Sequence, residues 1–260
     1  MQTYDAIVLA GGRGTGIDVS QPIKGLIEIA SKPMVAWVVE ALEKSEFIDR
    51  IVVVLPAQGM VGPWADNVTV IRSEGTLIEN CEAGLAGTDQ QNPLLWLSAD
   101  IPAITPQAIE DFLLRAARRQ AQIAYPVIPE EDVNRQFPGS ARTYIKLNEG
   151  RVTGGNMLMT TVTAAEKIRP IMSDLFEVRK EPVKVARLIG PALASKLALG
   201  RLGIPEVEKR IDKMFGLRAV GVITSYAAIG VDVDKGPDKR VMEQALAELG
   251  SSAASHVHLC

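Results

Sequence analysis

The chain has 260 residues, of which 47% are apolar and 23% are charged, and its formal net charge at pH 7 is -3. These ordinary globular proportions exclude a fibrous repeat and an intrinsically disordered chain. The negative balance also gives no support to a nucleic-acid-binding protein held by a basic surface, so we expect no nucleic acid among its partners.

Cysteine usage and hydropathy predict a cytoplasmic protein. Cys81 and Cys260 are too few to staple a secreted chain of this size, so reduced thiols are expected. Residues 1–5 lack the basic segment of a signal peptide. No run of about 18 uncharged apolar residues is present, so we expect no transmembrane segment.

In the first half of the chain, apolar runs alternate with segments of helical spacing. Runs typical of strands buried on both faces of a parallel sheet occupy residues 6–10, 51–55, 68–71 and 94–98. Helices are predicted between and after them, over residues 33–42, 76–86 and 105–120. This alternation is typical of βαβ units, so we predict an α/β fold, a Rossmann-like three-layer α/β/α sandwich with a mostly parallel sheet.

The second half is less regular, and three prolines between residues 126 and 138 predict a loop. After it we predict a strand and turn at 144–150, a helical insertion at about 182–215, strand character at 220–233 and a closing helix at 238–249. The insertion mixes basic and apolar residues. A solvated helix pair is its simplest interpretation, with a lid, a homodimer face or a membrane-surface contact as alternatives. We expect one domain over residues 1–250 and a flexible tail over 251–260.

A glycine-rich loop follows the first predicted strand, with the sequence Leu9-Ala10-Gly11-Gly12-Arg13-Gly14-Thr15-Gly16. Small residues there let backbone N–H groups approach an anion closely, which predicts a phosphate-binding loop; a simple chain reversal is the alternative. Two familiar phosphate loops do not match. Ile17-Asp18 stands where a P-loop requires lysine and serine or threonine, and Ile17 replaces the third glycine of the dinucleotide fingerprint.

Two further segments accompany this loop, Pro22-Ile23-Lys24-Gly25-Leu26 and Lys32-Pro33-Met34. Together the three segments resemble the signature of nucleotidyltransferases with a glycosyltransferase-A-like fold. This group includes sugar-phosphate nucleotidyltransferases, the molybdenum-cofactor guanylyltransferase and the methylerythritol-phosphate cytidylyltransferase. The resemblance returns near residues 230–238. It implies an enzyme that transfers a nucleoside monophosphate from a nucleoside triphosphate to a small phosphorylated acceptor, a sugar phosphate or an alcohol phosphate, and releases pyrophosphate.

The resemblance also implies the residues of the nucleotide site. Lys24 is expected to be the counter-charge of the α-phosphate, with a solvated surface lysine as the alternative. Gly16 stands where the family has an arginine, so Arg13 is the expected substitute cation. Asn80 lies in a segment that resembles the base-contacting part of the family, although an ordinary polar helix position is the alternative. The expected nucleotide-binding residues are Leu9, Ala10, Gly11, Gly12, Gly14, Thr15, Gly75 and Asn80.

Acidic residues in two distant regions predict a Mg²⁺ site. Asp100 follows the fourth predicted strand, at the sheet edge where ligands of open α/β sheets bind, although it could also be a helix-proximal cap. The resemblance implies that Asp100 holds Mg²⁺. It also implies a second ligand near the end of the chain, which aligns best with Asp234 and alternatively with Asp232. Asp238 is expected to cap the last helix.

The acceptor side is less specific. Gly155 and Asn156 resemble an acceptor-binding loop of the family, with a structural turn as the alternative. Three other functions stay open: a molybdenum-cofactor guanylyltransferase-like enzyme, a glycosyltransferase that uses a nucleotide sugar, and a non-catalytic nucleotide-binding regulator. Asp232-Val233-Asp234 is formally the D-x-D of a glycosyltransferase. The sequence identifies neither the base nor the acceptor, and a homodimer is one option for the assembly.

Overall fold

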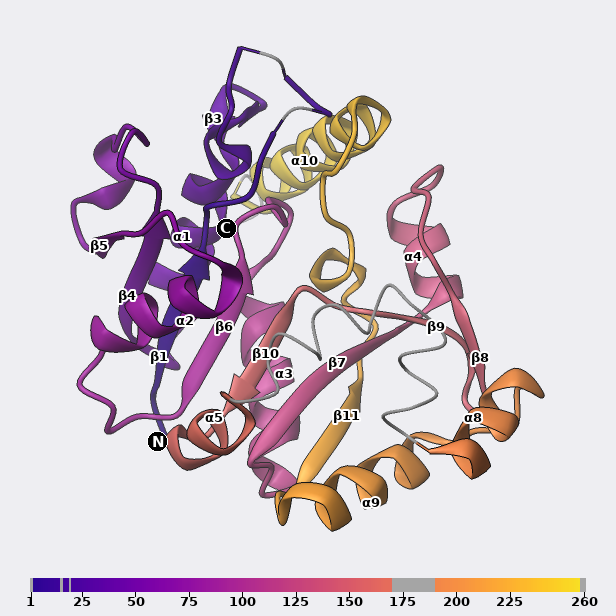
Figure 1. Cartoon of the computed structure of the whole chain (residues 1–260). Coiled ribbons are helices and arrows are strands. Elements are labelled where there is room, and N and C mark those ends of the chain that lie inside the picture. Colours follow the sequence, from indigo (N-terminus) through magenta and orange to yellow (C-terminus); the bar gives the residue numbers. More distant parts are fainter. Residues whose placement is uncertain (1, 15, 19, 170–189, 258–260) are drawn as a thin grey trace.

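The computed structural model describes residues 2–14, 16–18, 20–169 and 190–257, with side chains up to residue 248. Its centre is a mixed β-sheet (Figure 1) formed by β1 (Tyr4–Leu9), β4 (Ile48–Leu55), β5 (Thr69–Arg72), β6 (Leu94–Ser98), β7 (Ile123–Pro129), β8 (Ile145–Leu147), β9 (Gly150–Gly154), β10 (Met157–Thr160) and β11 (Ala219–Ile223). The strand order is β5-β4-β1-β6-β10-β7-β9-β8, and β11 pairs with β7.

The sheet has two parts with different pairing. Strands β5, β4, β1 and β6 are parallel to one another and form the N-terminal part. Strand β10 is antiparallel to both β6 and β7, and β9 is antiparallel to β7 and β8. Strand β11 lies parallel to β7. The sheet is therefore mostly parallel where the predicted βαβ units lie, and mixed beyond β6.

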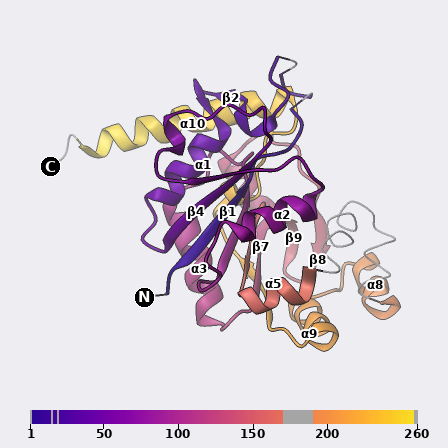
Figure 2. The same ribbon diagram turned by 60° about the vertical axis from the view of Figure 1, so that its left-hand side comes forward.

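Helices cover both faces of the sheet, as Figure 2 shows from a second direction. The helices are α1 (Met34–Glu43), α2 (Leu77–Ala86), α3 (Pro106–Arg118), α4 (Glu130–Gln136), α5 (Val162–Ile168), α8 (Pro191–Ala198), α9 (Ile204–Phe215) and α10 (Gly236–Val257). Apolar residues of α1, α3 and α10 share one buried cluster with Ala6 and Val8 of β1. Residues of α2 and α5 share another with Ile7. Because neighbouring residues of a strand point to opposite faces, this alternation confirms the three-layer sandwich.

Local signals place the early helices where the sequence predicts them. The Thr76 hydroxyl accepts a hydrogen bond from the Glu79 N–H (3.4 Å), and the Glu79 carboxylate accepts one from the Thr76 N–H (2.6 Å), which is a complete capping box. The Thr105 hydroxyl accepts from the Ala108 N–H (3.2 Å) and begins α3 in the same way. Pro33 is the N-cap of α1.

The predicted loop over residues 126–138 is wrong, because its first residues belong to β7 and the following ones to α4. Pro126 lacks an N–H group but is tolerated in the strand. It lies between the residues of β7 paired with β10 and those paired with β9, so that side of the ladder has no partner strand opposite it. Pro129 ends the strand and is the N-cap of α4.

The later part of the chain also differs from expectation. The strand predicted over 220–233 ends at Ile223, and the apolar residues that follow are buried in a 3₁₀ turn, η4 (Ala227–Ile229). The predicted insertion contains α8 and α9, which Gly200 separates with a left-handed φ of 63°, whereas its first residues, 182–189, lie outside the described part. Helix α10 extends to Val257 and so includes most of the segment expected as a tail. No helix among the described residues is long and apolar enough to cross a membrane.

Candidate functional site

The glycine-rich loop leaves the sheet at the carboxyl ends of the parallel strands. The Ala10 N–H donates to the Val54 carbonyl at the end of β4 (2.9 Å), and the Ala99 N–H donates to the Leu9 carbonyl at the end of β1 (3.2 Å). Three neighbouring strands therefore deliver the loop and Asp100 to one edge of the sheet. This edge is where open α/β sheets bind their ligands.

The loop is tied to the segment that carries Lys24. The Lys24 N–H donates to the Gly12 carbonyl (2.7 Å), and the Gly14 N–H donates to the Pro22 carbonyl (2.9 Å). Gly11 and Gly12 are exposed, so their backbone is accessible to an anion, whereas Gly14 is buried. A Cβ on Gly14 would lie only 2.6 Å from the Ile27 Cδ1 atom and 2.8 Å from a backbone oxygen, so this glycine is required by packing.

The structure brings Lys24, Asp100 and Asp234 together from three regions of the chain. The Lys24 ammonium contacts Oδ2 of Asp100 and Oδ1 of Asp234. The side chains of Lys24 and Asp100 are each 12% exposed, whereas that of Asp234 is 59% exposed. The backbone holds the two acidic segments in register, because the Val233 N–H donates to the Asp100 carbonyl (3.0 Å). Distant sequence positions thus form one charged cluster.

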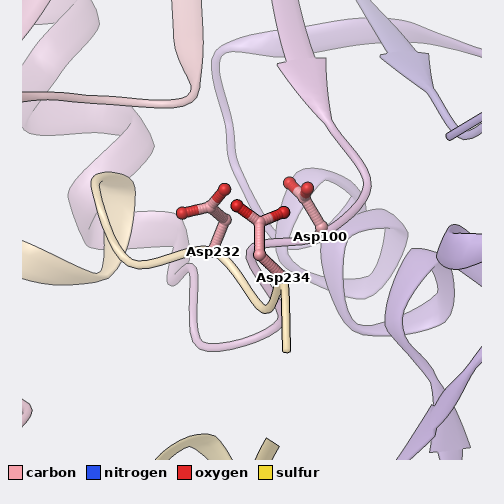
Figure 3. Close-up of side chains that lie close together, drawn as sticks. All are labelled: Asp100, Asp232 and Asp234. Atoms are coloured by element: carbon pink, nitrogen blue, oxygen red, sulfur yellow. The ribbon is translucent and has the colours of Figure 1, made fainter. Parts of the chain in front are cut away.

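Asp232 lies in the same cluster but has a different partner. Figure 3 shows the carboxylates of Asp100, Asp232 and Asp234 turned toward one another, and each offers an oxygen within 4.8 Å of the other two. The Arg142 guanidinium contacts the Asp232 side chain and also donates to its backbone carbonyl. Sequence reasoning missed Arg142, since a single arginine in the loop before β8 carries no motif that could reveal a partner in the distant 230–238 segment.

Burial and the neighbouring negative charges shift the pKa values of Lys24 and Arg142 in opposite directions. Burial alone would lower the pKa of Lys24, but the charges and hydrogen bonds of Asp100 and Asp234 raise it above the ordinary lysine value. Burial lowers the pKa of Arg142, although a guanidinium stays protonated in proteins. Both side chains are therefore cations at neutral pH, facing three carboxylates.

The carboxylate cluster has the chemistry of a divalent-cation site. Oδ1 of Asp100 is buried and has no hydrogen-bond partner among the described residues, which is costly unless a further group satisfies it. Carboxylate oxygens are the ligands that Mg²⁺ prefers. Helix α10 begins at Gly236, so Asp238 lies in its first turn and is not the N-cap; its carboxylate reaches back and accepts from the N–H groups of Asp234 (3.1 Å) and Lys235 (2.9 Å).

The predicted base-contacting residues lie beside the glycine loop. Nδ2 of Asn80 donates to the Gly75 carbonyl (3.1 Å), while its buried Oδ1 has no partner among the described residues. The same Nδ2 atom would be 3.7 Å from a Cβ on Gly11. Gly75 itself is required by packing, because a Cβ there would lie 2.6 Å from the Cβ atom of Glu79. Arg13 is exposed and forms a β-bridge with Ile23, and Thr15 lies outside the described residues.

The predicted acceptor residues lie next to the end of β6. The Asn156 N–H donates to the Ile229 carbonyl (2.8 Å), and its carbonyl accepts from the Ser98 N–H (3.0 Å). A Cβ on Gly155 would lie 2.6 Å from the Pro126 ring and 2.7 Å from the Ile229 side chain, so packing requires this glycine. The backbone of Asn156 thus joins β6 to the turn before Asp232.

The geometry agrees with what comparisons with known proteins find. A family model described as MobA-like NTP transferase domain matches residues 6–207. Over 131 residues, 47% of the chain, the sequence is 30% identical to the 2-C-methyl-D-erythritol 4-phosphate cytidylyltransferase of Nocardia farcinica and 29% identical to the bifunctional protein GlmU of Geotalea daltonii. These matches cover 56% and 28% of those proteins, so the chain spans only part of the length of the curated relatives.

A solved structure matches most of the chain. The structure of a hypothetical transferase from Thermus thermophilus has 35% sequence identity and a TM-score of 0.80, and the match covers 92% of this chain and all of that one (100%). This likeness confirms the predicted class of fold, that of the nucleotide-diphospho-sugar transferases.

Proposed function

Because the chain belongs to the family of MobA-like NTP transferase domains, we propose that it transfers a nucleoside monophosphate from a nucleoside triphosphate to a small phosphorylated acceptor. A sugar phosphate or an alcohol phosphate is the acceptor class, in keeping with the name of the Nocardia relative. A phosphate oxygen of the acceptor forms the new bond to the α-phosphorus. The bond from the α-phosphorus to the bridging oxygen breaks, and pyrophosphate leaves.

One observation carries this proposal: the convergence of the glycine loop, Lys24, Asp100 and Asp234 at the carboxyl edge of the parallel strands. Both reactants are anions, so the enzyme must hold them in line and offset their charge at the reacting phosphorus. The exposed backbone of Gly11 and Gly12 can donate to phosphate oxygens, and Lys24 supplies a cation beside them. No covalent intermediate is needed for this transfer.

The cofactor that fits the acidic cluster is Mg²⁺. Asp100 and Asp234 would hold it, and Asp232 is the less suitable ligand because Arg142 occupies it. When bound, the ion would neutralise phosphate charge and orient the triphosphate. Asp100 carries the strongest support, since its second carboxylate oxygen is buried without a partner among the described residues.

The remaining predicted residues define the two ends of the site. Gly75 and Asn80 lie beside Gly11, where the base of a triphosphate held by the loop would reach them, and the unsatisfied Oδ1 of Asn80 would accept from a base N–H group. Gly155 and Asn156 lie beyond β6 and form the proposed acceptor side. Arg13 is the proposed additional cation for the triphosphate. A single domain and a cytoplasmic location are further parts of the proposal.

Triphosphate binding followed by pyrophosphate release tests the proposal. Thermal unfolding is measured with each of ATP, CTP, GTP, UTP and dTTP, with and without Mg²⁺, because a ligand at a hundred times its Kd adds about 2.7 kcal/mol of stability. The preferred triphosphate is then incubated with a panel of sugar and alcohol phosphates, and released pyrophosphate is measured. We expect a Mg²⁺-dependent shift with one base that Asp100→Ala abolishes. Asp66→Ala, at an exposed carboxylate before β5, is the matched control. No shift with any triphosphate would rule the function out.

A further inference from the structure

The position between Asp100 and Asp234 already holds a cation, the ammonium group of Lys24. Its contacts to one oxygen of each carboxylate link the two residues most suited to bind Mg²⁺. A positively charged side chain and a divalent ion at the same two carboxylates repel each other, because like charges a few ångströms apart interact strongly where water is partly excluded. The ammonium and the metal ion therefore compete for this position.

The charges of the cluster indicate which of its two cations a metal ion could replace. Three carboxylates face two cations, and Arg142 is held by both the side chain and the backbone carbonyl of Asp232. Departure of Arg142 would break both of these contacts, whereas Lys24 is held, among the described residues, by its two carboxylates alone, and one of them, Asp234, is 59% exposed. Lys24 is thus the cation that can exchange.

The surroundings of Lys24 allow its head group to move while its backbone stays in place. The Lys24 N–H is bonded to the Gly12 carbonyl, and the aliphatic stem runs beside Gly12, whose absent Cβ would lie 3.6 Å from the Cβ and Cδ atoms of Lys24. A lysine head sits on a flexible four-carbon stem with rotatable donors. A rotation of the stem over Gly12 would move the ammonium from the two carboxylates toward the glycine loop, where the triphosphate is proposed to bind.

From this arrangement we infer that Lys24 is a built-in counter-cation that occupies the metal position in the nucleotide-free protein. A divalent cation enters when the ammonium transfers from Asp100 and Asp234 to the phosphates of the incoming triphosphate. The inference rests on the proposed function, because it needs a triphosphate to receive Lys24. It makes metal and triphosphate binding cooperative beyond their direct attraction, and this coupling acts equally in both directions.

Metal binding in the absence of nucleotide provides the test. The probe is Mn²⁺, whose free concentration is followed by electron paramagnetic resonance during titration of the full chain. Lys24→Met keeps the aliphatic stem against Gly12 but removes the charge, so we expect Mn²⁺ to bind at least tenfold more tightly than to the wild-type protein. A non-hydrolysable triphosphate should bind the same variant more weakly. Opposite changes for the two ligands are not expected from a merely structural role.

Two further variants keep the test decisive. Asp100→Asn should abolish the tighter Mn²⁺ binding when combined with Lys24→Met, which shows that the ion occupies this cluster. Circular dichroism checks the fold of each variant, and Lys24→Gln replaces Lys24→Met if the latter is unfolded. Mn²⁺ affinity that is unchanged or weaker in a folded Lys24 variant overturns the exchange alone. Absence of Mn²⁺ binding by every form, with and without triphosphate, overturns the metal-dependent function and the exchange with it.

Discussion

In the parallel part of the sheet, the glycine loop and Asp100 of the candidate site follow strand ends, whereas beyond β6 the position of Asp232 depends on a contact between distant segments. Asp100 directly follows β6, and the glycine loop directly follows β1. By contrast, Asp232 is held by Arg142, ninety positions earlier in the chain. Local order after strand ends therefore places the glycine loop and Asp100, whereas tertiary packing places Asp232 against Arg142 and brings Lys24 and Asp234 to Asp100.

The largest effect is expected at the ion pair between Arg142 and Asp232, on which the position of Asp232 depends. Arg142→Met should lower the free energy of unfolding by about 3–5 kcal/mol, because it leaves the carboxylate of Asp232, whose side chain is only 14% exposed, without its partner. Urea unfolding followed by circular dichroism measures the change. The matched control is Arg151→Met, which removes an ion pair to Glu130 from a side chain that is 56% exposed and should therefore change the free energy of unfolding far less.

A double variant sharpens this prediction. Arg142→Met combined with Asp232→Leu removes both charges, so it should recover part of the stability lost in the single variant. Equal stability of the Arg142→Met and Arg151→Met proteins would show that the two parts of the site do not differ in this way.

For a substitution of Asp100, the main expected effect is on the rate of catalysis. Asp100→Asn removes a charge that faces Lys24 and the proposed metal, and should lower kcat by about two orders of magnitude, or ~3 kcal/mol. Steady-state pyrophosphate release measures this, with Asp66→Asn as the exposed control. A loss smaller than threefold would remove Asp100 from the catalytic machinery.

The comparison also shows how much of the fold and of the candidate site could be predicted from the sequence. The glycine loop and Asp100 could be placed at strand ends because strands and turns are encoded within a few residues of each other, whereas Lys24 is expected from the family resemblance. The Arg142–Asp232 pair could not, because no local pattern reports which segments meet across the sheet. The error at residues 126–138 has the same origin: Pro126 signals a loop locally, but its pairing with Val222 of β11 holds it in a strand.

Glycine substitutions test whether close packing fixes the backbone both in the glycine loop and at the proposed acceptor residues. Gly155→Ala would place a Cβ 2.6 Å from the Pro126 ring, and Gly14→Ala would place one 2.6 Å from the end of the Ile27 side chain and 2.8 Å from a backbone oxygen. Each should lower the free energy of unfolding by about 1–3 kcal/mol. Gly12→Ala is the control, since its Cβ would meet nothing closer than 3.6 Å. Destabilisation by Gly12→Ala equal to that of the other two would contradict the packing explanation.

The smallest effect is expected from removing a helix cap. Two such caps are compared, one beside the proposed nucleotide site and one that stabilises the fold alone. Thr76 caps α2 and Thr161 caps α5, each through a hydroxyl that accepts from a backbone N–H three residues later (3.4 and 3.2 Å). Replacing either by alanine should cost about 1 kcal/mol in urea unfolding. Only Thr76→Ala should also weaken triphosphate binding, measured by calorimetry, because its capping box holds the segment that carries Gly75 and Asn80. Equal triphosphate affinity in both variants would remove this segment from the nucleotide site, and would leave the glycine loop and Lys24 to bind the triphosphate without a base contact from α2.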